Sequence, residues 1–312
     1  MKQTVLITGG TGLVGKALTN ALVEKGYKVI ILTRDIKGKK QGEKITYAKW
    51  DVEKQEIDID ALQQADHIIH LAGAPVVEKK WTAAYKKEIR DSRIESSRLM
   101  IAALKNNENK VRAIVSASAI GWYGADVYPV TPFTEDDAAD GSFLGQTCKL
   151  WEAGIEPVTG LGKRLVKLRI GIVLSNDGGA LVEFKKPLRF RIAAILGNGK
   201  QVTSWIHIDD LCNMLIAGIE NENLSGSYNA VAPNPVSNKE LTLTLAKAIR
   251  GKFFLALHVP SFVLKTMMGE SSIEVLKSTT VSCKKIQDAG FKFTFKTIEA
   301  SIKDFVTATD RH

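Results

Sequence analysis

Residues 4–15, Thr-Val-Leu-Ile-Thr-Gly-Gly-Thr-Gly-Leu-Val-Gly, lead from an apolar β-type run into a helical pattern through a cluster of glycines. Gly9, Gly12 and Gly15 are spaced three residues apart. Glycine allows a sharp turn after a strand, lets backbone N–H groups approach a pyrophosphate, and lets the helix pack closely on the strand. A second apolar run begins at Val29. This order predicts a dinucleotide-binding βαβ unit, with the pyrophosphate at the helix N-terminus.

The alternation of strand and helix patterns continues and predicts an α/β fold, a Rossmann-type doubly wound parallel sheet. We expect strands near 4–8, 28–32, 45–49, 66–71, 111–117 and 165–170, and helices near 13–25, 59–64, 81–106 and 143–161. After about residue 175 turn signals interrupt the rhythm, and further helices are expected near 210–221 and 237–250. We therefore expect an NADP-binding domain at 1–174. A smaller C-terminal α/β substrate region at 175–312 would return some strands or helices to it.

Composition excludes several classes of protein. No stretch of 18 apolar residues occurs, so no membrane span is expected, and the first strand begins too early to leave room for a signal peptide. The three cysteines, Cys148, Cys212 and Cys283, lie far apart, which fits neither a disulfide framework nor a zinc site. Free cysteines suit a reducing compartment, so a cytoplasmic location is expected.

The net charge of +9 comes from 43 basic and 34 acidic residues. The basic residues are dispersed, with no basic tail and no stripe interleaved with aromatic residues. This pattern favours a small anionic ligand, or simply a solvated lysine surface, over nucleic acid. We expect a small-molecule substrate and no nucleic-acid or membrane partner.

Four further motifs follow expected strand ends or come later in the chain: His70–Ala74, Ser116–Gly124, Arg169–Leu174 and Trp205–Leu211. In this order they resemble the extended short-chain dehydrogenase/reductase superfamily, in its nucleotide-sugar epimerase and dehydratase branch. Cys148–Glu152 is similar to the Cys-x-x-Trp-Glu of an atypical, epimerase-family subgroup that carries a small C-terminal domain of unknown function. The tail agrees with that subgroup at 259–264, 269–270 and 289–293. The resemblance covers nearly the whole chain and implies a nucleotide-sugar as candidate substrate and a monomer or homodimer.

The end of the second strand predicts which dinucleotide binds. Arg34 stands where a guanidinium can hold the 2′-phosphate of NADP, so NADP is favoured. NAD is the alternative, since Asp35 could take the ribose 2′-OH or merely pair with a lysine. Asp51 resembles the acid near the adenine, although an exposed strand-end carboxylate would look the same. The full set expected to contact the cofactor is Gly9, Gly12, Leu13, Val14, Gly15, Thr33, Arg34, Asp51, Leu71, Ala72, Gly73 and Lys149.

The resemblance implies catalysis by a serine, a tyrosine and a lysine, the last two spaced Tyr-x-x-x-Lys on one helix face. Ser118 matches the serine and Lys149 the lysine, but Gly145 stands where the tyrosine belongs. Lys149 is expected to bond the nicotinamide ribose rather than act as a base. Tyr123 and Cys148 are candidate substitutes for the proton donor, and the remaining alternative is that nothing replaces the tyrosine.

His207 and Asp209 could suggest a metal site, because strand alternation would put both on one face. No further histidine or cysteine has ligand spacing, so no metal is predicted. The resemblance implies instead that this segment ties the substrate region to the sheet.

Two functions remain open. The first is an NADP-dependent oxidoreductase or epimerase acting on a nucleotide-sugar or another small polar carbonyl or hydroxyl compound. The alternative is a non-catalytic NADP(H)-binding regulatory or redox-sensing protein that acts through a protein partner. The complete glycine loop and the retained serine favour the first, whereas the missing tyrosine favours the second.

Overall fold

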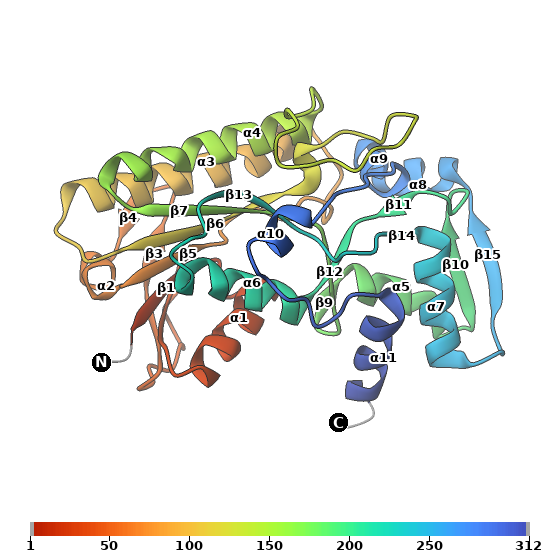
Figure 1. Cartoon of the computed structure of the whole chain (residues 1–312), viewed down its shortest axis with the longest axis horizontal. Helices are drawn as coiled ribbons and strands as arrows, with labels where there is room; N and C mark the ends of the chain where they lie inside the picture. The colour runs from red at the N-terminus through yellow and green to blue at the C-terminus, as the bar shows by residue number, and fades with distance from the viewer. Residues whose placement is uncertain (1–2, 310–312) are drawn as a thin grey trace.

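A computed structural model describes residues 3–309 and confirms the α/β fold. Its central sheet has the strand order β13-β7-β6-β5-β1-β2-β3-β4 within the described residues (Figure 1). All neighbours pair in parallel except β3 and β4. The strands are β1 (Thr4–Thr8), β2 (Lys28–Thr33), β3 (Ile45–Asp51), β4 (Glu56–Ile57), β5 (His67–His70), β6 (Ala113–Ala119), β7 (Arg164–Ile170) and β13 (Gly226–Ala230).

The direction of strand addition reverses at β1, which lies between β2 and β5. In open parallel sheets the crevice at such a switch point, beyond the carboxyl ends of the strands, is where ligands bind. β1 is apolar on both faces because both are covered. Val5 and Ile7 belong to one core cluster and Leu6 to the other, and all three are fully buried.

Helices cover the two faces of the sheet (Figure 1). One face carries α1 (Leu13–Glu24) and α6 (Ile208–Glu220), and the other carries α2 (Ile59–Gln64), α3 (Ala83–Asn106) and α4 (Phe143–Ile155). The hydroxyl oxygens of Thr82 and Ser142 accept hydrogen bonds from the first turns of α3 and α4, which is why these helices begin where they do. Residues Glu156–Leu161, expected to continue α4, form a 3-10 helix with a proline near its start.

The C-terminal part is irregular and returns β13 to the main sheet and α6 to its surface. It adds three small sheets, with strand orders β12-β8-β9, β11-β14 and β10-β15. Its other strands are β8 (Ile172–Ser175), β9 (Gly178–Gly179), β10 (Ile192–Leu196), β11 (Val202–Thr203), β12 (Trp205–His207), β14 (Val236–Ser237) and β15 (Leu255–Val259). Its other helices are α5 (Ala180–Leu188), α7 (Asn238–Arg250), α8 (Ser261–Met268), α9 (Ser272–Leu276), α10 (Lys284–Asp288) and α11 (Ile298–Thr309).

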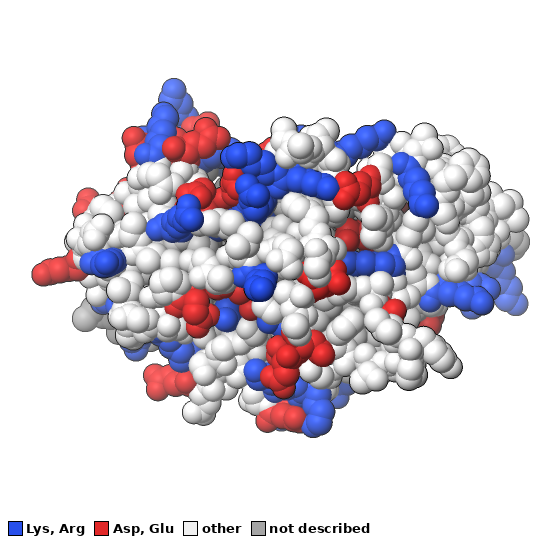
Figure 2. All heavy atoms as spheres, turned by 90° about the horizontal axis from the view of Figure 1, so that it is seen from above, with Lys and Arg blue, Asp and Glu red and all other residues white. Residues whose placement is uncertain are grey.

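The surface seen in Figure 2 mixes positive and negative side chains over most of its area. The outer side of α3 contributes ion pairs such as Lys87–Asp91 and Arg98–Glu95. The end of the molecule that carries β10 and β15 is largely uncharged in this view. Across residues 3–309, none of the helices combines the length and apolar character needed to span a bilayer.

Candidate active site at the dinucleotide cleft

The glycine loop adopts a conformation that requires glycine. Gly9 has a φ of +72°, and a Cβ there would lie 2.8 Å from the backbone carbonyl of Leu71. A Cβ on Gly15 would lie 2.4 Å from the carbonyl oxygen of Gly9, so this glycine lets α1 approach the strand. Gly12 is the N-cap of α1 and has no capping side chain, and the first turn carries no acidic residue. The positive end of the helix is therefore open to an anion.

The opposite wall of the loop, Leu71–Gly73, is held by a network that the sequence analysis missed. The Thr8 hydroxyl oxygen accepts from the backbone N–H groups of Leu71 and Ala72, each at 3.1 Å. It lies 2.7 Å from Nδ1 of His70, to which it donates its own proton. Burial lowers the pKa of His70 to about 4, so the ring is neutral near pH 7. The sequence signal that could have revealed this network is the pair Thr8 and His70, two polar residues that lie opposite each other on the neighbouring strands β1 and β5.

Together these segments border a cleft of about 980 Å³. Eight of the predicted cofactor residues line it: Gly9, Gly12, Thr33, Arg34, Asp51, Leu71, Ala72 and Gly73. Leu13, Val14 and Gly15 form the start of α1 behind Gly12 and are absent from the lining. Residues of α3 that the sequence analysis did not single out complete the wall, among them Glu88, Asp91 and Ser92.

The end of the cleft beside β2 presents an unpaired cation. Arg34 is exposed and forms no salt bridge with any described residue. Asp35 instead accepts a hydrogen bond from the backbone N–H of Lys37 at 2.8 Å, so its carboxylate stabilises the following turn. Asp51 accepts from the backbone of Glu53 and Lys54 and keeps its place in the lining.

Ser118 lies at the carboxyl end of β6 in a buried polar network. Its hydroxyl donates to Oε1 of Glu152 at 2.8 Å. Glu152 is 5% exposed and accepts from Nε of Arg169 at 2.8 Å and from Nη2 at 3.2 Å. The hydroxyl of Ser227, on β13, also donates to Glu152, at 3.1 Å. Strands β6, β7 and β13 and helix α4 thus meet at one carboxylate.

The face of α4 that meets this network differs from the one predicted. Lys149 is exposed and donates no hydrogen bond to any described residue, so the structure does not bring it to Ser118. Cys148 and Glu152 are buried, and they are four residues apart. Cys148 and Glu152 therefore have the four-residue spacing expected for the tyrosine and the lysine, but each lies three residues after the expected position, Gly145 or Lys149. The carbonyl oxygen of Asp140 lies 2.2 Å from where a Cβ on Gly145 would be, leaving no room for a side chain.

Comparison with known proteins agrees with this architecture. The model of the NAD-dependent epimerase/dehydratase family matches residues 5–148, and that of a domain of unknown function, DUF1731, matches residues 259–305. An epimerase family protein of Staphylococcus aureus, SAR0825, is 35% identical over 98% of this chain and 100% of its own length. The chain belongs to the epimerase family.

Two solved structures extend this family assignment. The human epimerase family protein SDR39U1, solved with NADPH, is 27% identical with a TM-score of 0.84, covering 98% of this chain and 99% of its own. A nucleoside-diphosphate sugar epimerase from Corynebacterium glutamicum is 29% identical with a TM-score of 0.77. The match covers 98% of this chain and 58% of the Corynebacterium glutamicum chain, which is longer.

Tyr123, one of the predicted substitutes for the family's tyrosine, is fully buried. Its hydroxyl donates to Oδ1 of Asn229 at 2.7 Å and accepts from Nη1 of Arg169 at 2.9 Å. Its ring stacks on Phe133 at 5.1 Å, and burial raises its pKa to about 12. These contacts argue against a tyrosine that swings into the cleft and favour a structural role.

Cys148, the other predicted substitute, is 4% exposed. Burial raises the pKa of its thiol to about 12, although the nearby guanidinium of Arg93 and the backbone of Ala119 act in the opposite direction. The adjacent Lys149 lies on the exposed side of the helix and is not among the groups that act on this pKa. The thiol therefore stays protonated at neutral pH.

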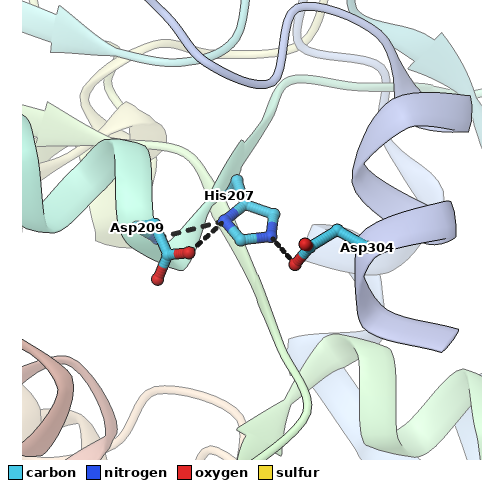
Figure 3. A group of neighbouring side chains, drawn as sticks. All are labelled: His207, Asp209 and Asp304. Atoms are coloured by element: carbon cyan, nitrogen blue, oxygen red, sulfur yellow. Dashed lines mark hydrogen bonds and ion pairs between the residues drawn. The ribbon is translucent and has the colours of Figure 1, made fainter. Parts of the chain in front are cut away.

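His207 and Asp209 do not share a strand face, because β12 ends at His207 and α6 begins at Ile208. Nδ1 of His207 accepts from the backbone N–H of Asp209 at 3.1 Å, which makes the histidine the N-cap of α6. Figure 3 shows the carboxylates of Asp209 and Asp304 at opposite edges of the ring, the latter 3.4 Å from Nε2. The one lone pair of the neutral ring is already used, so the three groups do not fit a common metal ion.

The ring of His207 also stacks between Phe295, at 3.7 Å, and Phe305, at 4.3 Å. Phe305 and Asp304 belong to α11, and His207 belongs to the β12–α6 junction. The cluster therefore ties the C-terminal helix of this epimerase-family chain to the element that leads back to the main sheet.

Proposed function

We propose that this chain binds NADP(H) in the cleft and uses it to interconvert a carbonyl and a hydroxyl group. The substrate would be a nucleotide-sugar or another small polar compound. The observation that carries the proposal is the open N-terminus of α1, which faces the same cleft as the unpaired Arg34. A dinucleotide spans such a cleft with its pyrophosphate on the helix and its adenosine ribose at the end of β2. The relative SDR39U1 was solved with NADPH.

Arg34 would select NADPH over NADH. Replacing Arg34 with alanine is expected to weaken NADPH binding roughly 10- to 100-fold, because a guanidinium–phosphate pair contributes about 1.5–3 kcal/mol. NADH binding should be unchanged. Fluorescence titration of both cofactors measures this, with Lys37→Ala, an exposed cation of the adjoining turn, as the matched control. Equal loss of both cofactors in Arg34→Ala would contradict the assignment.

Roles can be assigned around Ser118 for the reduction direction of this interconversion. When bound, the cofactor supplies the hydride. Ser118 donates its own proton to Glu152, so only its oxygen lone pairs remain for a ligand, and a product hydroxyl fits them. Cys148 occupies the helix position that the catalytic tyrosine would take relative to Glu152. Its protonated thiol would donate a proton to the carbonyl oxygen as the hydride arrives at carbon, and water would reprotonate the thiolate.

Replacing Cys148 with alanine tests this proton transfer. We expect turnover of NADPH with a reactive carbonyl substrate to fall roughly 100-fold or more, the usual contribution of a general acid, while NADPH affinity is retained. Cys212→Ala, which removes another buried thiol on α6, is the control and should leave turnover unchanged. Full turnover in the Cys148 variant would exclude the thiol as donor.

One observation favours the second candidate, a non-catalytic NADP(H)-binding regulator. Ser118 and Cys148 are both buried and neither lines the cleft. The carbonyl screen separates the two functions. If wild-type protein binds NADPH tightly but oxidises it with no nucleotide-sugar or simple carbonyl compound tested, the regulatory function is favoured.

A further inference from the structure

Arg93, on α3, is a buried cation without a counter-ion. Its side chain is nine-tenths buried, yet no carboxylate of the described residues lies within salt-bridge distance of it. Nη1 donates to the carbonyl oxygen of Ile89 at 2.7 Å, and the structure shows no acceptor for Nε or Nη2 among residues 3–309. The guanidinium also lies over the ring of Trp151, 4.8 Å from its centre. Burying a charge in this way is costly unless something compensates it.

The position of this guanidinium connects the cleft with the candidate catalytic residues. A Cβ on Gly73 would lie 3.1 Å from its central carbon and 3.3 Å from Nε and Nη2. Gly73 lines the cleft and Arg93 itself does not, so the two donors without acceptors lie behind the cleft wall, against Gly73. The contact with Trp151 places the guanidinium against α4, and its charge acts to lower the pKa of the Cys148 thiol. The contrast with Arg169 is clear, because Arg169 has the Glu152 carboxylate as its partner.

We infer that Arg93 is the binding residue for an oxyanion, a phosphate or carboxylate group carried by the ligand into the cleft beside Gly73. A guanidinium offers parallel N–H donors that match two oxygens of such a group, and Nε and Nη2 form such a pair. The inference rests on the proposed function in placing a ligand in this cleft. The inference adds that the part of the ligand beside Gly73 carries a negative charge. The oxyanion could belong to the dinucleotide or to a second, acidic substrate.

The test compares wild-type protein with Arg93→Met and Arg93→Lys. Arg90→Met, which removes an exposed arginine of the same helix, is the control. NADPH affinity is measured by titration. Inorganic phosphate affinity is measured by calorimetry at constant ionic strength, on the free protein and on protein saturated with NADPH.

If the dinucleotide supplies the oxyanion, Arg93→Met weakens NADPH at least 10-fold. If a second substrate supplies it, NADPH affinity is unchanged, whereas phosphate binding seen with the wild type is lost. Arg93→Lys keeps the charge but not the paired donors, so it should lose about 5-fold or more in the same measurement. If Arg93→Met does not fold, the loss of affinity in Arg93→Lys tests the inference instead.

The inference is overturned if wild-type protein and Arg93→Met bind NADPH with equal affinity and also bind phosphate with equal affinity. It is also overturned if wild-type protein binds no phosphate and NADPH affinity does not depend on Arg93. Failure of the proposed function would look different, since wild-type protein would then not bind NADPH. The phosphate measurement on free protein would still test Arg93.

Discussion

Replacing Gly12 with alanine is expected to weaken NADPH binding roughly 100-fold, or about 2.7 kcal/mol, with little change in the stability of the free protein. A Cβ at Gly12 would meet only the carbonyl oxygen of Gly9, at 3.4 Å, which is ordinary contact. The residue lines the cleft at the N-terminus of α1, so the added methyl group would occupy space needed by the pyrophosphate. Cofactor titration and thermal unfolding of the same preparation measure both quantities.

Gly15→Ala is the matched comparison, because it adds the same methyl group behind the loop. There the Cβ would lie 2.4 Å from the carbonyl oxygen of Gly9 and 2.5 Å from Cα of Gly10, and backbone atoms cannot easily move away. Overpacking of this kind costs about 1–3 kcal/mol, so the melting temperature should fall. NADPH binding by Gly12→Ala at wild-type affinity would show that the pyrophosphate does not approach this part of the loop.

The second large effect is expected at Glu152. Glu152→Ala should lower the free energy of unfolding by about 3–5 kcal/mol, because it leaves the buried guanidinium of Arg169 without its partner. It also removes the acceptor of Ser118 and Ser227. Urea unfolding measures the loss. Adding Arg169→Met to Glu152→Ala should recover part of it, since the double variant no longer buries an unpaired charge.

Glu156→Gln is the control for this prediction. Glu156 directly follows α4 and accepts from Nζ of Lys167 at 2.6 Å, but 53% of its side chain is exposed. The Lys167 side chain is 13% exposed and keeps Glu152 at 3.9 Å, and glutamine retains an oxygen that can accept from it. The replacement at the exposed Glu156 should therefore cost less than about 1 kcal/mol. Similar losses from the two variants would mean that burial does not strengthen the Glu152–Arg169 pair.

Local patterns predicted most of the sheet. The strand predicted at 4–8 is β1 and the helix predicted at 59–64 is α2, with the same bounds. These elements follow from apolar periodicity and from a cap such as Asp58, whose carboxylate accepts from the backbone of Ala61. The glycine loop was equally predictable, because its constraint is steric and acts over a few residues.

The sequence was a weaker guide where the answer depends on how an element is rotated or where it ends. The role of Lys149 at the nicotinamide ribose stays a prediction, whereas the packing of α4 on β6 turns Cys148 and Glu152 inward and leaves Lys149 exposed. Alternation suggested a strand through Asp209, whereas His207 caps a helix that starts at the next residue. Neither outcome is encoded in spacing alone.

By itself, therefore, the sequence determined the α/β class, the dinucleotide loop and the cation at the end of β2, since each follows from short-range sterics, periodicity or charge. Only the tertiary structure decided which side chains share the buried site. Glu152, Arg169 and Ser227 come from three separate elements, and their contacts exist only once β13 has joined the sheet. The isolation of Arg93 was also a tertiary result. A missing counter-ion is a property of everything packed around a charge, and no single stretch of the chain contains that information.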